Sequence, residues 1–249
     1  DRNTLCVSSQ VGCLMGCKFC ASTKANFVRD LQAAEILNQV YEVEKDTGAR
    51  IDNIVLGGSG EPLENMVEVL RFIRLVTDPK GKNLSMRSIT LSTSGLVPNI
   101  YRLADEGLSI NLAISLHATS DKKRQETMPV AKKYSIQEIL DACQYYFEKT
   151  GRRVSYEYVL IEGVNDRKED LDWMIANLQG PESHVNIIPL NEIAEYDGKA
   201  ADFQALRTFQ DKLTKNHVSA TIRNKRGADI DGACGQLRIN YEERVEERG

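Results

Sequence analysis

The sequence predicts an α/β fold, specifically a partial, open (β/α)6 barrel with parallel strands. Strand-like and helix-like segments alternate along the whole chain, a rhythm typical of βαβ units with right-handed crossovers. Six such units precede a final short strand, which fits a partial barrel better than a closed eight-fold one. The 249 residues contain no low-complexity linker and are enough for one large core. We therefore expect a single domain that spans 1–249.

The expected strands are short apolar runs, of which 154–161 is the one with β-branched and aromatic residues. In chain order they are 4–9, 53–56, 88–92, 110–116, 154–161, 185–188 and 219–223. The expected helices repeat apolar residues near the helical period. In chain order they are 31–47, 63–76, 98–106, 136–149, 170–178 and 203–216. Asp30 and Gly48 are the expected cap and stop of the first helix, and Ser135 the cap of the fourth.

Composition narrows the classes of protein. Hydrophobic residues make up 41% and charged residues 27%, and the apolar runs are too short to cross a membrane. The chain has 6 cysteines and no secretory segment, which favours a reducing cytoplasm and cysteines used as ligands or in catalysis. A net charge of −4 argues against a nucleic-acid binder but is compatible with a local basic rim. The chain opens at Asp1, directly before a strand and without a methionine, so we expect a piece of a longer protein.

Cys13, Cys17 and Cys20 lie in one short stretch with the spacing C-x3-C-x2-C. Closed [4Fe–4S] sites use four thiolates, so three thiolates leave one iron open to bind another ligand. This spacing favours an open cluster. The alternatives are half of a zinc site, completed by His117 or Cys234, and a disulfide with one spare cysteine.

A glycine-rich loop, GGSGEP at 57–62, follows the second major strand. Its glycines allow a ligand to approach the backbone closely, and Glu61 can accept hydrogen bonds from an ammonium group. An ordinary strand-to-helix turn would use the same residues, with Pro62 near the first helical turn. The loop differs from a dinucleotide fingerprint, which has the pattern G-x-G-x-x-G.

Three further motifs stand at strand ends, where parallel strands gather their loops on one face. The motif LSTSG at 91–95 contains Ser92, and its hydroxyl groups can bind a ribose or a carboxylate. Ser, Thr and Gly are also the residues of an ordinary turn. The motif at 115–117 stands at the end of the expected strand 110–116 and contains His117, and a lone histidine is more often structural. Asn191 follows another strand and could recognise an adenine edge, but alone it is a turn residue.

The remaining cysteines differ in context. Cys143 has apolar neighbours at helical spacing and is expected in the core. Cys234 lies in a glycine-bearing loop of the kind that exposes a side chain. Cys6 lies in the first strand, where a cysteine is usually buried.

Taken together and in order, these motifs resemble the RlmN/Cfr family of radical S-adenosylmethionine (SAM) RNA methyltransferases. The motifs that carry the resemblance are LCVSSQVGC at 5–13, GEP at 60–62, LSTSG at 91–95, ISLH at 114–117 and DIDGACGQL at 229–237. The likeness covers essentially the whole chain. Pro62 favours the RlmN branch, which methylates carbon 2 of adenosine in 23S rRNA and tRNA, over the Cfr branch, which methylates carbon 8.

The resemblance implies a radical SAM barrel with a [4Fe–4S] cluster on Cys13, Cys17 and Cys20. It implies SAM contacts from a set at the strand ends: Gly60, Glu61, Ser92, Ser115, Leu116, His117 and Asn191. It also implies that Cys234 carries the methyl group to the base in a covalent protein–RNA intermediate, and that Cys6 takes the carbon 2 proton and then closes a transient disulfide with Cys234.

The resemblance further implies an RNA partner, an electron donor such as flavodoxin or ferredoxin, a monomer and a cytoplasmic location. The family's N-terminal helical RNA-binding domain and a glutamate base would lie upstream of Asp1. Candidate phosphate contacts are Lys18, Lys24, Arg29, Arg223, Lys225 and Arg226, each of which could equally be a solvated surface residue. The alternative to a radical SAM enzyme is a protein of another class, a non-enzymatic iron–sulfur or zinc protein.

Overall fold

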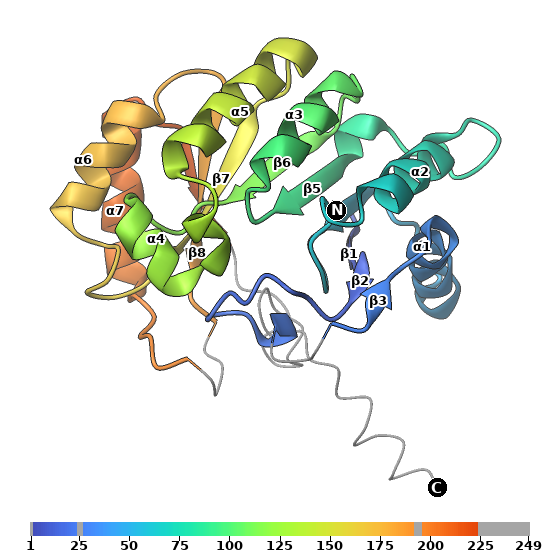
Figure 1. Ribbon diagram of the computed structural model, residues 1–249, viewed down its shortest axis with the longest axis horizontal. Helices are drawn as coiled ribbons and strands as arrows, with labels where there is room; N and C mark the ends of the chain where they lie inside the picture. The colour runs from blue at the N-terminus through green and yellow to red at the C-terminus, as the bar shows by residue number, and fades with distance from the viewer. Residues whose placement is uncertain (1, 24–26, 192–195, 224–249) are drawn as a thin grey trace, which may run out of the picture.

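The computed structural model describes residues 2–23, 27–191 and 196–223. Seven parallel strands form one sheet in the order β1-β4-β5-β6-β7-β8-β9, and Figure 1 shows this sheet curled around one side. The strands are β1 (Thr4–Val7), β4 (Asn53–Leu56), β5 (Ile89–Thr93), β6 (Asn111–Ser115), β7 (Val154–Leu160), β8 (Ser183–Pro189) and β9 (Ala220–Ile222). The predicted α/β fold, a partial barrel of six βα units and a final strand, is confirmed.

Six helices connect consecutive strands of this sheet and lie along its outer side (Figure 1). They are α1 (Ala33–Thr47), α2 (Met66–Thr77), α3 (Val97–Asp105), α5 (Ile136–Thr150), α6 (Lys168–Asn177) and α7 (Phe203–Lys215). The outward strand residues, such as Ile54, Leu112 and Val185, are fully buried against these helices. The burial of this apolar surface is the main force that holds the layers together. Among the described helices, none has the length and apolar character needed to cross a bilayer.

The inward strand residues alternate with this apolar set, as the pleat of a strand requires. Many are small or polar: Thr90, Ser92, Asn111, Ala113, Ser115, Ser155 and Asn186 face one cavity inside the sheet. Closed barrels of this class fill their interior with bulky branched side chains. Here the small inward residues leave the interior open for a ligand.

The helix ends show which sequence signals were reliable. Gly48 ends α1 in the left-handed conformation at φ 67°, and Ser135 forms a capping box with Glu138 at the start of α5, so both predictions are confirmed. The prediction that Asp30 caps α1 is wrong. Gln32 is the N-cap, and the carboxylate of Asp30 instead accepts a hydrogen bond from the Gln10 amide at 2.8 Å.

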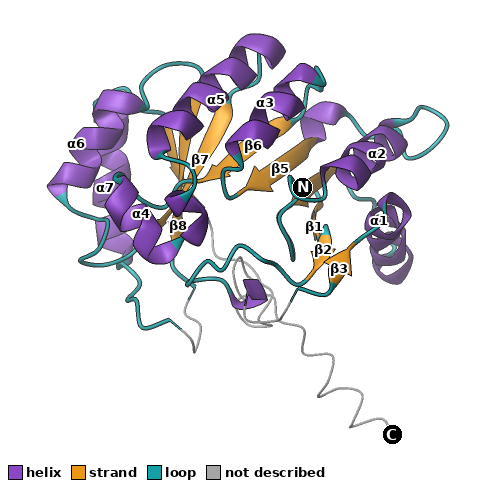
Figure 2. Ribbon diagram, viewed as in Figure 1, coloured by secondary structure: helices purple, strands orange, loops and turns teal. Residues whose placement is uncertain are grey.

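Two elements that lie next to the cysteine loop, a short β-ribbon and a helix, were not predicted from the sequence. A two-residue antiparallel ribbon, β2 (Gln10–Val11) with β3 (Arg29–Asp30), closes the base of the cysteine loop. Helix α4 (Asp121–Thr127) follows β6, and Figure 2 shows it beside the cysteine loop. Its sequence DKKRQET has no apolar residues at helical spacing. The available sequence signal for its start was Ser120, an N-cap residue whose hydroxyl accepts a hydrogen bond from the Lys123 N–H at 3.4 Å.

Candidate active site

One cavity of about 1140 Å³ occupies the concave side of the sheet and collects most of the predicted site residues. Ten of them line it: Cys6, Cys13, Cys17, Cys20, Gly60, Glu61, Ser92, Ser115, His117 and Asn191. They come from five strands of the sheet or from the segments that follow them: β1, β4, β5, β6 and β8. Parallel strands bring their carboxyl ends to one edge of a sheet, and this topology explains why residues far apart in sequence meet here.

The cysteine loop is held against the end of α4. The Lys18 N–H donates to the carbonyl oxygen of Thr127 at 2.9 Å. Gly16 has a φ of 70°, and a Cβ there would lie 3.2 Å from Cγ of Pro129. Glycine at this position therefore allows both the left-handed turn and the close approach. The loop between Cys13 and Cys20 is thus fixed by the unpredicted helix.

The three thiols of this loop differ in exposure: Cys17 is buried, and Cys13 and Cys20 are half-buried. Burial raises the pKa of Cys13 to about 11 and that of Cys17 to about 12. The charge of Cys20 adds to the rise at both sites, because neighbouring thiolates repel. Only thiolates bind iron, so ligation at these sites displaces protons.

An all-sulfur set that lines a ligand-sized cavity fits an iron–sulfur cluster. Within the described ranges, no three His, Cys, Asp or Glu side chains converge as ligands of a single ion. A cluster has no need of such convergence, because each cysteine binds a different iron.

The glycine-rich loop after β4 is hydrogen-bonded to the segment that leads into the cysteine loop. The N–H of Gly58 donates to the carbonyl oxygen of Val7 at 3.0 Å, and the Ser59 N–H donates to the hydroxyl of Ser8 at 2.9 Å. A Cβ at Gly58 would lie 2.9 Å from the backbone of both residues, so only glycine fits. These contacts fix the Gly60–Glu61 pair relative to the cysteines.

Glu61 is 3% exposed, and its carboxylate is already bonded to backbone donors. Oε2 accepts from the Ser94 N–H at 2.7 Å, and Oε1 accepts from the Leu63 N–H at 3.1 Å. Burial raises the pKa of Glu61, and the Ser94 bond opposes the rise. The side chain therefore joins the loops after β4 and β5. Contact between the Glu61 carboxylate and an ammonium group stays a prediction.

His117 has a φ of 54°, a left-handed conformation that is uncommon outside glycine. Its Nδ1 accepts a hydrogen bond from the Val159 N–H at 3.0 Å, so Nε2 carries the proton of the neutral ring. Burial, assisted by the charge of Arg124, lowers the pKa of His117 to about 3. The ring packs edge-on to Phe19 with centroids 4.8 Å apart. His117 can therefore offer an N–H donor, and no charge, to a ligand in the cavity.

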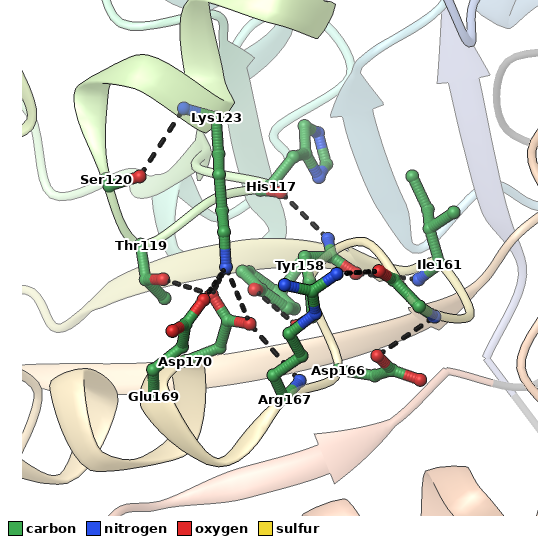
Figure 3. A network of polar contacts seen from close by, with 12 residues as sticks. His117, Thr119, Ser120, Lys123, Tyr158, Ile161, Asp166, Arg167, Glu169 and Asp170 are labelled. Carbon is green, nitrogen blue, oxygen red and sulfur yellow. Dashed lines mark hydrogen bonds and ion pairs between the residues drawn. The ribbon is translucent and has the colours of Figure 1, made fainter.

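A buried polar network holds the His117 loop in place (Figure 3). The Asn165 amide donates to the carbonyl oxygens of His117 at 2.9 Å and Val159 at 2.8 Å, and it accepts from the Ile161 N–H at 2.7 Å. Asp170 is fully buried in the same network and pairs with Lys123 at 2.9 Å.

Leu116 does not lie with the other predicted SAM contacts. Its side chain is fully buried and does not line the cavity. Its backbone joins neighbouring loops, since its N–H donates to the carbonyl oxygen of Glu157 at 3.1 Å. Any contact between Leu116 and SAM stays a prediction and would involve backbone atoms.

Cys6 faces the cavity and is solvent-accessible there, although a strand cysteine is usually buried. The cavity walls still remove enough water to raise the pKa of its thiol, while the charge of Arg223 and the Gly57 N–H lower it. Arg223 also lies 3.9 Å from the carboxylate of Glu157, which accepts from the Asn186 amide at 2.9 Å. The patterns missed Glu157 and Asn186; polar residues at alternate positions of the expected strands were the available signal.

Several expectations concern other parts of the chain. Cys143 is 2% exposed inside the core, as predicted. Arg29 forms an exposed ion pair with Glu35 at 2.7 Å. Four predicted residues lie outside the described ones: Lys24, Lys225, Arg226 and Cys234.

Comparison with known proteins identifies the class that this fold and site define. The family model of the radical SAM superfamily matches residues 7–174. The chain therefore belongs to the radical SAM superfamily, whose members use a [4Fe–4S] cluster and SAM.

Relatives place the chain more narrowly. It is 51% identical over 245 residues to a probable dual-specificity RNA methyltransferase RlmN of Lachnospira eligens, covering 98% of this chain and 70% of that one. It is 54% identical over 239 residues to the protein of the same name in Clostridium perfringens (strain 13 / Type A), covering 96% and 69%. A crystal structure of a radical SAM methyltransferase from Sphaerobacter thermophilus superposes with a TM-score of 0.92 at 42% identity, covering 96% and 71%. Within the superfamily, the chain belongs to the RlmN family.

Proposed function

We propose that this protein methylates carbon 2 of a specific adenosine in 23S rRNA and in tRNA through a methylated Cys234 and a covalent protein–RNA intermediate. The observation that carries the proposal is that one cavity of about 1140 Å³ is shared by the cysteine triplet, the strand-end loops and Cys6. The names of the relatives, which are RNA methyltransferases, support an RNA substrate.

Cys13, Cys17 and Cys20 would hold the cluster, and the loops after β4, β5, β6 and β8 would hold SAM. When bound together, the two groups supply one-electron chemistry that an amino-acid side chain lacks. The chain's part is to orient the ligand and to exclude water. The neutral ring of His117 donates from Nε2, and the Glu61 carboxylate keeps two of the loops in register.

Two sulfurs would handle the methyl group. Cys234, as a thiolate, attacks the methyl carbon of SAM and displaces the neutral thioether. After the carbon of this methyl group has joined adenine carbon 2, Cys6 takes the proton from carbon 2. The sulfur of Cys6 then attacks that of Cys234, so that an S–S bond forms as the S–C bond breaks and the released carbon is protonated to the methyl group. The charge of Arg223 favours the thiolate of Cys6 for this work.

The adenosine must leave its stack to enter the cavity, so we propose a single-stranded or looped RNA segment as substrate. The electron would come from a small carrier such as flavodoxin or ferredoxin. A catalytic disulfide that opens again in each cycle suits a reducing cytoplasm. We propose that the protein works there as a monomer.

The test is anaerobic reconstitution followed by electron paramagnetic resonance with and without SAM, and then by mass mapping of adenosine from treated RNA. The proposal expects a spectrum that changes when SAM is added, and 2-methyladenosine in the digest. An unchanged spectrum would indicate a non-enzymatic iron–sulfur protein, and 8-methyladenosine would indicate Cfr-type chemistry; either result contradicts the proposal.

A further inference from the structure

Arg124, on α4, is a fully buried cation that the sequence patterns did not single out. Its three hydrogen bonds all go to backbone carbonyl oxygens. Nε donates to Leu116 at 3.2 Å, and Nη2 donates to Ser94 at 2.5 Å and Ser115 at 3.1 Å. Gly95 makes room for the guanidinium, since a Cβ there would lie 3.3 Å from Nη2.

None of these three bonds goes to an acidic group. The other terminal nitrogen, Nη1, is buried and has no hydrogen-bond partner in the part of the chain that the structure describes. Burying a charge is costly unless it is paired. Carbonyl dipoles satisfy the N–H groups they touch, but they do not neutralise a full positive charge.

The cysteine loop packs against the same helix. Lys18 next to Cys17 donates its N–H to Thr127 at the end of α4, and Gly16 on the other side packs on Pro129. Burial lowers the pKa of Arg124 to about 10, so it remains charged, and the thiolate of Cys17 opposes that lowering. The other acid that acts on it, Asp121, is exposed and bonded to the Ile136 N–H at 2.7 Å. Cys17 is therefore the buried acid whose charge acts on Arg124.

We propose that Arg124 is a positioning residue that serves as the buried counter-ion of the cysteine site, holding the loops after β5 and β6 while its charge offsets that of the ligated cluster. Three thiolates make the ligated cluster an anion, and one-electron reduction adds a further negative charge. A nearby buried cation stabilises the reduced form more than the oxidised one, so it raises the reduction potential.

The experiment compares three variants after anaerobic reconstitution without RNA: Arg124→Met, Arg124→Lys and Lys122→Met. Lys122 is exposed on the same helix, so the last variant loses the same charge at the surface. Iron per chain and the midpoint potential are measured for each, the latter with dithionite as the electron source. The inference rests on the iron–sulfur cluster of the proposed function. Neither measurement involves RNA, so a negative result for Arg124 can be told apart from a wrong assignment of the RNA substrate.

Arg124→Met is expected to disfavour reduction at least about tenfold, a potential about 59 mV more negative. Arg124→Lys, which keeps the charge but loses the planar fork, and Lys122→Met are expected to stay within about threefold of the wild type. A wild-type potential in Arg124→Met, or an Arg124→Lys variant as impaired as Arg124→Met, would show that the residue only supports the backbone. If Arg124→Met holds no iron, Arg124→Lys decides: wild-type iron and potential support the proposal, and their loss overturns it.

Discussion

Replacing Asn165 by alanine removes the side chain that fixes the position of the His117 loop. Asn165 is 1% exposed and makes three side-chain hydrogen bonds, to the backbones of His117, Val159 and Ile161. A buried hydrogen bond contributes about 1 kcal/mol net, and an abandoned buried partner costs about 1–3 kcal/mol. Asn165→Ala should therefore reduce the free energy of unfolding by about 3 kcal/mol or more.

Urea denaturation with a shared m-value measures this loss directly. The matched control is Asn177→Ala, because the amide of Asn177 donates to the carbonyl oxygen of Trp173 at 2.8 Å on an exposed helix face. That control should change stability by less than about 0.5 kcal/mol. The SAM affinity of Asn165→Ala should also fall about tenfold, which corresponds to one misplaced hydrogen bond. If Asn165→Ala lost no more stability than the control, the role of the network in Figure 3 would be refuted.

Two further predictions concern the same region. Lys123→Met leaves the buried carboxylate of Asp170 without its cation and should lower the free energy of unfolding in urea by about 3 kcal/mol. The control Lys168→Met removes an exposed ion pair and should lower it by less than about 0.5 kcal/mol. Equal losses would contradict the stabilising role of the Lys123–Asp170 pair. The pKa of His117 in the folded state, about 3, lies below its value in the unfolded state, which is about 6.5. The contribution of this neutral ring to stability is therefore fully present above about pH 6.5. It is lost as the pH falls from about 6.5 towards 3, by up to about 1.4 kcal/mol per pH unit. His117→Asn should flatten this part of a stability-against-pH curve. An unchanged slope in this variant would be the contrary result.

The sequence predicts much of the site because its chemistry sits at strand ends. Once 53–56 and 88–92 are recognised as parallel strands, Glu61 and Ser92 must reach one edge of the sheet. The cysteine spacing is likewise a local signal, and it needs no tertiary information.

Other features depend on tertiary contacts that no local pattern contains. Helix α4 is polar along its length, so nothing indicates that Arg124 is turned inward and fully buried. Asn165 is an ordinary turn residue in sequence and becomes a clamp only because β6 and β7 are neighbours. Arg223, which directly follows β9, meets Glu157 of β7 because both of these strands are neighbours of β8 in the sheet.

The proposed reaction requires that Cys6 and Cys234 act on the same RNA-bound carbon. The most direct measurement is denaturing electrophoresis and mass spectrometry of the reconstituted Cys6→Ala variant after reaction with SAM, reductant and RNA. We expect a covalent protein–RNA species that is absent when Cys234→Ala is added to the same variant. Normal release of methylated RNA by Cys6→Ala, without any such species, would contradict the account.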